Sequence, residues 1–117
     1  MKLRIDPDKI CFRLTLGELN HLLDQGEIKE VVTLPNGCLT YQVICLPEQS
    51  NAEFTGDTQN YTLSLAREVI ENHKENLPSM DGIISKFPCR DDGVITVSLA
   101  VNLKKKPTPS TFKSATK

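Results

Sequence analysis

Residues 93 to 103 read Gly-Val-Ile-Thr-Val-Ser-Leu-Ala-Val-Asn-Leu and decide the fold of this chain. Side chains alternate between the two faces of a β-strand, so this spacing predicts one long strand with a dry face and a face of small or polar groups. The dry face consists of Ile95, Val97, Leu99, Val101 and Leu103. The segments upstream must therefore supply the cover that keeps these side chains away from water.

The chain opens with two short alternating strands and a helix. Residues 2–5 and 10–14 alternate polar with apolar residues, and the turn at residues 6–8 predicts that they form a hairpin. The stretch Thr15-Leu16-Gly17-Glu18 matches a capping box, in which the Thr hydroxyl and the Glu carboxylate each accept from a free backbone amide at the start of a helix. The helix carries leucines at helical spacing and ends at Gly26, which tolerates a left-handed conformation.

A second hairpin follows the helix and predicts a pairing register. Its turn is Leu34-Pro35-Asn36-Gly37, where Pro presets a type I turn and Gly takes a left-handed bulge position. This turn sets Leu34 opposite Cys38, and the same register puts Ile28 opposite Ile44, with Val32 on their face. Aliphatic residues then lie on both faces of the hairpin. Either other parts of the protein cover both faces, or one face is an apolar surface for a partner. The two strands are residues 27–34 and 38–46.

The same order of elements occurs again in the second half of the chain. A hairpin from residues 53–55 and 58–65 leads into a helix over residues 66–76, and a last hairpin joins residues 82–87 to residues 93–103. Strand, helix and hairpin thus follow one another twice, which suggests two structurally similar halves. The sequence predicts an α+β fold, with two helices packed on a mainly antiparallel sheet of about seven to eight short strands built from hairpins.

Charge divides the chain into a body and a tail. Residues 1–103 hold nine basic and fifteen acidic residues, a net charge of −6, whereas residues 104–117 hold five lysines and no acid. We expect the first range to form a single α+β domain and the second to be a flexible basic tail. No apolar run approaches the roughly 20 residues that cross a bilayer, and the alternating N-terminus lacks the apolar core of a secretory signal. We therefore expect a cytoplasmic protein with no membrane contact.

The opening of the chain resembles a known family. The stretches K-L-R-I, I-C-F-R-L-T-L-G-E-L and G-E-I-K-E resemble the start of a small uncharacterised bacterial family, whose members begin with two short strands and a capped helix. The similarity continues in L-T-Y-Q-V, Y-T-L-S-L and I-T-V-S-L-A-V, so it spans most of residues 2–101. In that family an acidic, basic and aromatic stretch follows the last strand, where this chain has three lysines. No activity is known for the family, so the resemblance implies no function.

Few residues suggest catalysis, a metal or a cofactor. The two histidines, His21 and His73, lie in predicted helices without the convergent partners that a metal site or a catalytic base needs. Cys11 and Arg13 point to the same side of one strand, but a partly buried small apolar residue beside a surface cation explains them better than an activated thiol does. Asp91-Asp92-Gly93 fits a turn better than a calcium loop. We predict no metal and no cofactor, and the sequence favours a protein that is not an enzyme.

The cysteines agree with a reducing compartment. Cys11, Cys38, Cys45 and Cys89 are irregularly spaced and include no CxxC pair of the kind that binds zinc or forms a redox centre. We therefore expect four free thiols.

The surface pattern favours a protein-interaction module. Hairpins leave exposed edge strands, which invite dimerisation or strand addition by a partner. Together with aliphatic residues on both faces of the second hairpin, this predicts a small inhibitor or adaptor that regulates a larger protein, with a homodimer through strand edges as one form of assembly. The residues expected to take part are Ile28, Val32, Ile44, Lys104, Lys105 and Lys106.

Two other functions remain open. The first is a small-ligand-binding protein or metal-dependent enzyme with a pocket between the sheet and the helices. The second is nucleic-acid binding through the lysine tail, which counterion release would favour. The acidic body and the lack of interleaved basic and aromatic residues argue against nucleic acid.

Overall fold

The computed structural model describes residues 1–78 and 82–103 of the chain, so the predicted tail lies outside the described residues. Within those ranges the protein has an α+β fold with both predicted helices and all of the predicted hairpins. The helices are α1 (Leu16–Gln25) and α2 (Arg67–Glu75). The strands are β1 (Lys2–Asp6), β2 (Lys9–Thr15), β3 (Glu27–Leu34), β4 (Gly37–Leu46), β5 (Glu53–Gly56), β6 (Asn60–Ala66), β7 (Ile83–Pro88) and β8 (Val94–Asn102).

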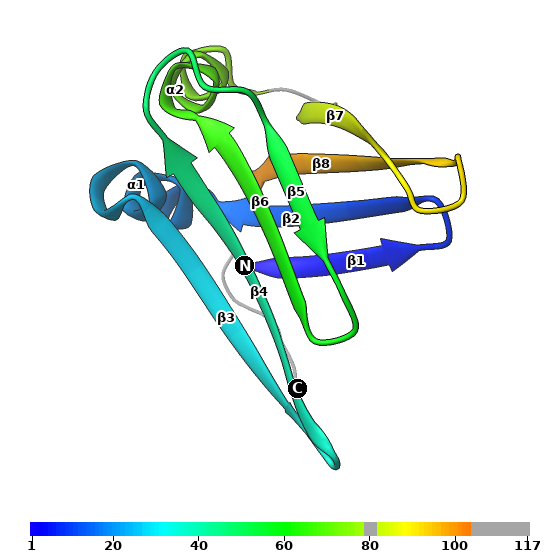
Figure 1. Cartoon of the computed structure of the whole chain (residues 1–117). Coiled ribbons are helices and arrows are strands. Elements are labelled where there is room, and N and C mark those ends of the chain that lie inside the picture. The colour runs from blue at the N-terminus through cyan, green and yellow to red at the C-terminus, as the bar shows by residue number, and fades with distance from the viewer. Residues whose placement is uncertain (79–81, 104–117) are drawn as a thin grey trace.

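The strands form two four-stranded sheets, so the expectation of a single sheet is wrong. The expectation of mainly antiparallel pairing is right for four of the six strand pairs, and the other two are parallel. Sheet A has the order β1-β2-β8-β7, and sheet B has the order β3-β4-β6-β5. In each sheet two antiparallel hairpins meet at a parallel pair, β2 with β8 or β4 with β6. Turns and local alternation reveal hairpins, whereas a parallel pair joins strands that are distant in the sequence. Figure 1 shows that the strands of the two sheets run in clearly different directions.

Each half of the chain contributes one hairpin to each sheet. The first half runs from β1 to β4 around α1, and the second runs from β5 to β8 around α2. In both halves the hairpin before the helix enters one sheet and the hairpin after the helix enters the other. The order of elements therefore confirms two similar halves, which exchange hairpins rather than forming separate sheets.

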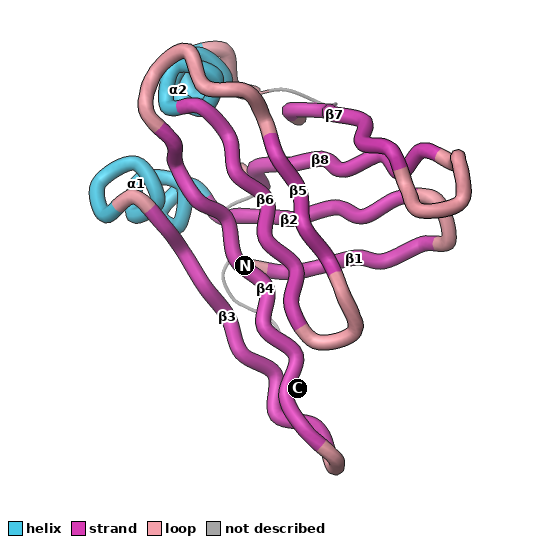
Figure 2. The backbone as a smooth tube through the Cα atoms, viewed as in Figure 1, coloured by secondary structure: helices cyan, strands magenta, loops and turns pink. Residues whose placement is uncertain are grey.

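The core lies between the two sheets. Both helices contact strands of both sheets, and Figure 2 shows them gathered at one end of the strands, which they close. Within the predicted dry face of the last strand, Val97 and Leu99 are fully buried, whereas Leu103 lies beyond the end of β8 and is 36% exposed. The largest fully buried side chains are Phe12, Leu14, Leu19, Leu22, Leu63, Ile70, Leu99, Val43 and Val97.

The predicted capping box sets the start of α1. The Glu18 amide donates to Thr15 Oγ1 at 3.1 Å, and the Thr15 amide donates to Glu18 Oε1 at 2.9 Å. The helix ends where Gly26 takes a left-handed φ of 88° and its amide donates to the Leu22 carbonyl at 2.8 Å. These local bonds pair backbone groups that the helix leaves without a partner at its two ends. The helix then leads the chain from sheet A to sheet B.

The β3–β4 hairpin pairs one residue away from the predicted register. Leu34 pairs with Gly37, so a two-residue loop replaces the predicted bulge. Ile28 therefore lies opposite Val43, a fully buried core residue, and Ile44 moves to the other face of the sheet. A shift of one residue has this effect because side chains alternate along a strand.

The buried face of β8 gives a test of the core. We expect Leu99→Asp to abolish cooperative thermal unfolding, because it places a carboxylate among buried aliphatic side chains at a cost of more than about 4 kcal/mol. Leu103→Asp is the matched control and should change the free energy of unfolding by less than about 1 kcal/mol. Circular dichroism melting of both variants tests this assignment, and a Leu99→Asp protein that melts like the parent would contradict it.

Candidate interaction site

The outer part of the β3–β4 hairpin extends away from the core. In Figure 1 the hairpin reaches past the turn between β5 and β6. Every residue from 31 to 38 is exposed, and Val31 and Leu34 are 55% and 47% exposed. We call residues 31–38 the arm. The arm presents apolar side chains directly to water.

The arm is apolar on both of its faces. Val32 pairs with Leu39 and shares the inward side of sheet B with the core, and Leu34 lies on the same side. Val31 faces the opposite side, because it pairs with Thr40. Single exposed aliphatic residues are common on protein surfaces, but three within four residues form a contact surface that a partner could cover from either side.

The structure brings together only part of the predicted interaction set. Ile28 and Val32 lie on the same face of β3, where Ile28 is half-buried at the root of the arm and Val32 is 37% exposed. Ile44 is half-buried on the opposite face of the sheet, so the predicted pairing of Ile28 with Ile44 is wrong. Lys104, Lys105 and Lys106 lie outside the described residues.

The strand β3 forms an edge of sheet B. It stands first in the strand order and, in the described part of the chain, pairs only with β4. Alternate N–H and C=O groups of β3 therefore point away from the sheet toward a position where another strand could bind. Proteins commonly protect such edges with charged side chains, yet the arm contains no charged residue. The charges of β3, at Glu27, Lys29 and Glu30, lie nearer its root.

Contacts with the amino terminus hold the root of the arm. The Met1 ammonium donates to Glu18 Oε2 and lies 3.4 Å from Glu30 Oε2. The Tyr41 hydroxyl donates to the Met1 carbonyl at 3.3 Å. We call Met1, Glu18, Glu30 and Tyr41 the amino-terminal clamp. It ties the start of the chain to α1 and to both strands of the arm.

The clamp depends on the charge of Glu18. Glu18 uses one carboxylate oxygen for the capping box and the other for the Met1 ammonium. Burial raises the pKa of this carboxyl, but the bonds from the ammonium and from Thr15 outweigh burial, so the pKa lies below its ordinary value of 4.5. The sequence identified Glu18 only as a helix cap. Nothing local marks the clamp, because its bonds join residues 17 to 40 positions apart.

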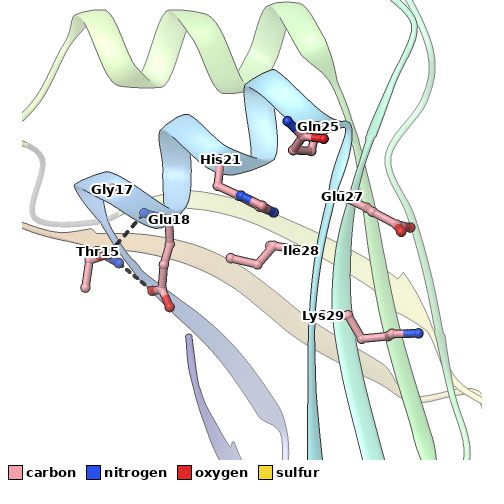
Figure 3. A pocket seen from close by; sticks show the side chains of 8 residues that line it. All are labelled: Thr15, Gly17, Glu18, His21, Gln25, Glu27, Ile28 and Lys29. Carbon is pink, nitrogen blue, oxygen red and sulfur yellow. Dashed lines mark hydrogen bonds between the residues drawn. The ribbon is translucent and has the colours of Figure 1, made fainter.

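An open hollow of about 590 Å³ lies between α1 and the root of β3. Figure 3 shows its side chains, and the bonds drawn there are those of the capping box. The His21 side chain is exposed and makes no hydrogen bond or ion pair with another described residue, so it is not paired with a nucleophile as a catalytic base would be. The hollow places polar groups beside the root of β3, not beside the arm itself. Its lining residues are Thr15, Gly17, Glu18, His21, Gln25, Glu27, Ile28 and Lys29.

The other residues singled out from the sequence lie apart from the arm. His73 has a buried Nε2 without a hydrogen-bond partner among the described residues, and burial lowers its pKa. Asp92 takes a left-handed φ of 64° in the loop between β7 and β8, in keeping with a turn. Cys11 is half-buried, and all four cysteines are free thiols.

The described part of the chain comprises residues 1–78 and 82–103. No three His, Cys, Asp or Glu side chains in these ranges gather closely enough to hold a metal ion. No helix in the same ranges is long and apolar enough to cross a membrane.

The chain matches a known protein family along most of its length. A protein-family model described as a family of unknown function, DUF7009, matches residues 1–101. The match covers both halves of the fold, almost to the end of β8. A search of curated proteins finds no match.

The amino-terminal clamp predicts a pH-dependent contribution to stability. Because the pKa of Glu18 is lowered by folding, its contribution is fully present above about pH 4.5 and is lost as the pH falls through the lower folded pKa. We expect Glu18→Gln to reduce the free energy of unfolding by about 1 to 2 kcal/mol at pH 7 and by much less near pH 3.

Urea unfolding at several pH values measures this difference. Glu27→Gln is the matched control, because Glu27 lines the same hollow but its side chain is exposed and makes no hydrogen bond or ion pair with another described residue. It should change stability by less than about 0.5 kcal/mol. An equal deficit for Glu18→Gln at pH 7 and pH 3 would show that its charge does not stabilise the fold.

Proposed function

The chain belongs to the DUF7009 family, whose function is unknown, and we propose that it is a non-catalytic protein-interaction module that binds its partner through the arm. The observation that carries this proposal is the exposed, uncharged and doubly apolar end of an edge hairpin. Water solvates such a surface poorly, and another protein that covers it would gain from burial of the aliphatic side chains.

Strand addition is the binding mode that the arm supports. A partner strand laid along β3 would pair with its free backbone groups, and those hydrogen bonds would supply affinity. Pockets for Val31 on one side and for Val32 and Leu34 on the other would supply specificity, because alternate side chains face opposite sides of a strand. The same edge would also allow a second copy to pair, giving a homodimer.

The firmly held root suits the arm to a regulatory role. The clamp and the capped helix hold the root in place before a partner arrives, so binding would require little ordering of the backbone at that end. A small inhibitor or adaptor of a larger protein or enzyme works in this way, by presenting a preformed element that covers part of its target.

We also infer a bacterial, cytoplasmic protein. The resemblance of the opening strands to bacterial sequences supports the source. Four free thiols support the compartment, since Cys38 and Cys89 are exposed and such thiols persist best in a reducing environment. The basic tail, Lys104, Lys105 and Lys106 included, could extend the contact area toward an acidic partner.

A matched pair of variants tests the arm. Val32→Lys combined with Leu34→Lys places two charges on its inner face, whereas Val94→Lys places a charge on another exposed valine, which is 58% exposed at the start of β8. In affinity purification from the native cell followed by sizing of the complex, we expect the parent and Val94→Lys to retain one stoichiometric partner. The arm variant should retain at least about tenfold less, since covering a charged patch with apolar residues costs free energy.

The melting temperature of the arm variant should stay within a few degrees of the parent, because both positions are exposed. Retention of the same partner by the folded arm variant would contradict the proposal. Loss of the partner on removal of residues 104–117, with the arm intact, would move the site to the tail. Sedimentation of the parent over a range of concentrations separates a homodimer from a complex with another protein.

A further inference from the structure

A second surface lies between the two sheets, at the end away from the helices. Strands β2 and β6 contribute Ile10 and Tyr61, which lie near the beginnings of these strands. Each of the two residues lies five positions before a helix cap, Thr15 or Ala66. Together with the β5–β6 and β7–β8 hairpins they border a groove of about 680 Å³. Clefts that bind small molecules have volumes of about 300 to 1,000 Å³, so the groove is large enough for one.

Aromatic residues are concentrated in this groove. The described residues include five aromatic side chains, and three of them, Phe54, Tyr61 and Phe87, line the groove and remain partly exposed. We call these three the aromatic wall. The Phe54 ring centroid lies 6.4 Å from that of Tyr61 and 5.9 Å from that of Phe87, and Phe12 packs edge-on against Phe54 from the core. The groove therefore has a firm apolar floor that reaches the surface.

A glycine gives the aromatic wall its shape. A Cβ atom at Gly56 would lie 3.0 Å from Tyr61 Cδ1 and 3.2 Å from Phe54 Cε2, closer than ordinary contacts. Gly56 thus lets both rings lie directly over the backbone of β5, where any larger residue would push them aside.

The rim of the groove carries one uncommitted cation. Arg90 lines the groove, is exposed, and makes no hydrogen bond or ion pair with any described residue. Asp57 also lines the groove, but its Oδ1 accepts from the amides of Gln59 and Asn60, each at 2.8 Å, and is therefore committed to the β5–β6 turn. A ligand with a negative group would have to direct it toward Arg90 and away from Asp57, since like charges repel.

We propose that this groove binds a small organic anion, with its apolar, ring-containing body on the aromatic wall and its single negative group paired with Arg90. A planar guanidinium binds carboxylate, sulfonate or phosphate oxygens with charge-assisted hydrogen bonds, and the rings favour a flat apolar body. This site is separate from the arm, so it stands or falls independently of the proposed protein interaction.

Two dyes with the same kind of aromatic body separate the charge from the rings. 8-Anilinonaphthalene-1-sulfonate carries one negative group, and N-phenyl-1-naphthylamine carries none. We expect the native full chain to bind the anionic dye saturably at one site, with a rise in melting temperature. Arg90→Gln should weaken the anionic dye by roughly tenfold and the neutral dye by less than about twofold, because only the former uses the guanidinium.

Control variants identify the groove. Arg13→Gln removes the same charge from an exposed position outside the groove and should leave both dyes unchanged. Phe87→Leu keeps an apolar side chain but removes one ring of the aromatic wall, and should weaken both dyes. The thiols give a second readout, since Cys89 lines the groove and Cys38 does not, although both are exposed. The anionic dye should slow alkylation of Cys89 and leave that of Cys38 unchanged.

Three results would overturn the proposal. The first is a native protein that binds neither dye saturably. The second is an equal weakening of the anionic dye by Arg90→Gln and Arg13→Gln, which would indicate a general effect of net charge. The third is equal protection of Cys38 and Cys89, which would indicate binding spread over the surface.

Discussion

The fold depends on two parallel strand pairs, β2 with β8 and β4 with β6. Each pair joins a hairpin of the first half to a hairpin of the second, so neither half can complete a sheet by itself. Within each half the helix carries the chain from one sheet to the other, and both helices then pack against both sheets. The inward faces of the two sheets share one core. The two halves therefore stabilise each other, and every surface described above is positioned by that exchange.

The sequence predicts the features that arise from neighbouring residues. Turn residues and alternation reveal the hairpins, and the Thr15 to Glu18 box reveals the start of α1, because each pattern lies within a few positions. The parallel pairs and the clamp leave no such signal, since their partners are far apart in the chain. The arm was recognisable as aliphatic on both faces, but a two-residue loop in place of the bulge moved Ile44 away from Ile28. The aromatic wall was not recognisable, because its three rings come from separate strands.

The arm and the groove occupy equivalent places in the two halves. In β4, Leu46 pairs with Ala66, the cap of α2, and Leu39 lies seven residues before Leu46. In β8, Asn102 pairs with Thr15, the cap of α1, and Ile95 lies seven residues before Asn102. Leu39 pairs with Val32 of the arm, and Ile95 pairs with Phe87 of the aromatic wall. Val32 and Phe87 are therefore counterparts, and both lie on edge strands, β3 and β7, although Val32 belongs to the exposed arm and Phe87 lines the groove.

The side chains at the counterpart positions differ in size. Phe54 and Leu3 are also counterparts. Phe54 pairs with Leu63, three residues before the α2 cap, and Leu3 pairs with Phe12, three residues before the α1 cap. Phe54 reaches Phe87, with 5.9 Å between ring centroids, and the two rings wall the groove. Leu3 and Val32 are smaller, and Val32 stays 37% exposed. One backbone plan thus gives an exposed aliphatic arm in the first half and an aromatic groove in the second, so an anion in the groove would leave the arm open to a protein partner.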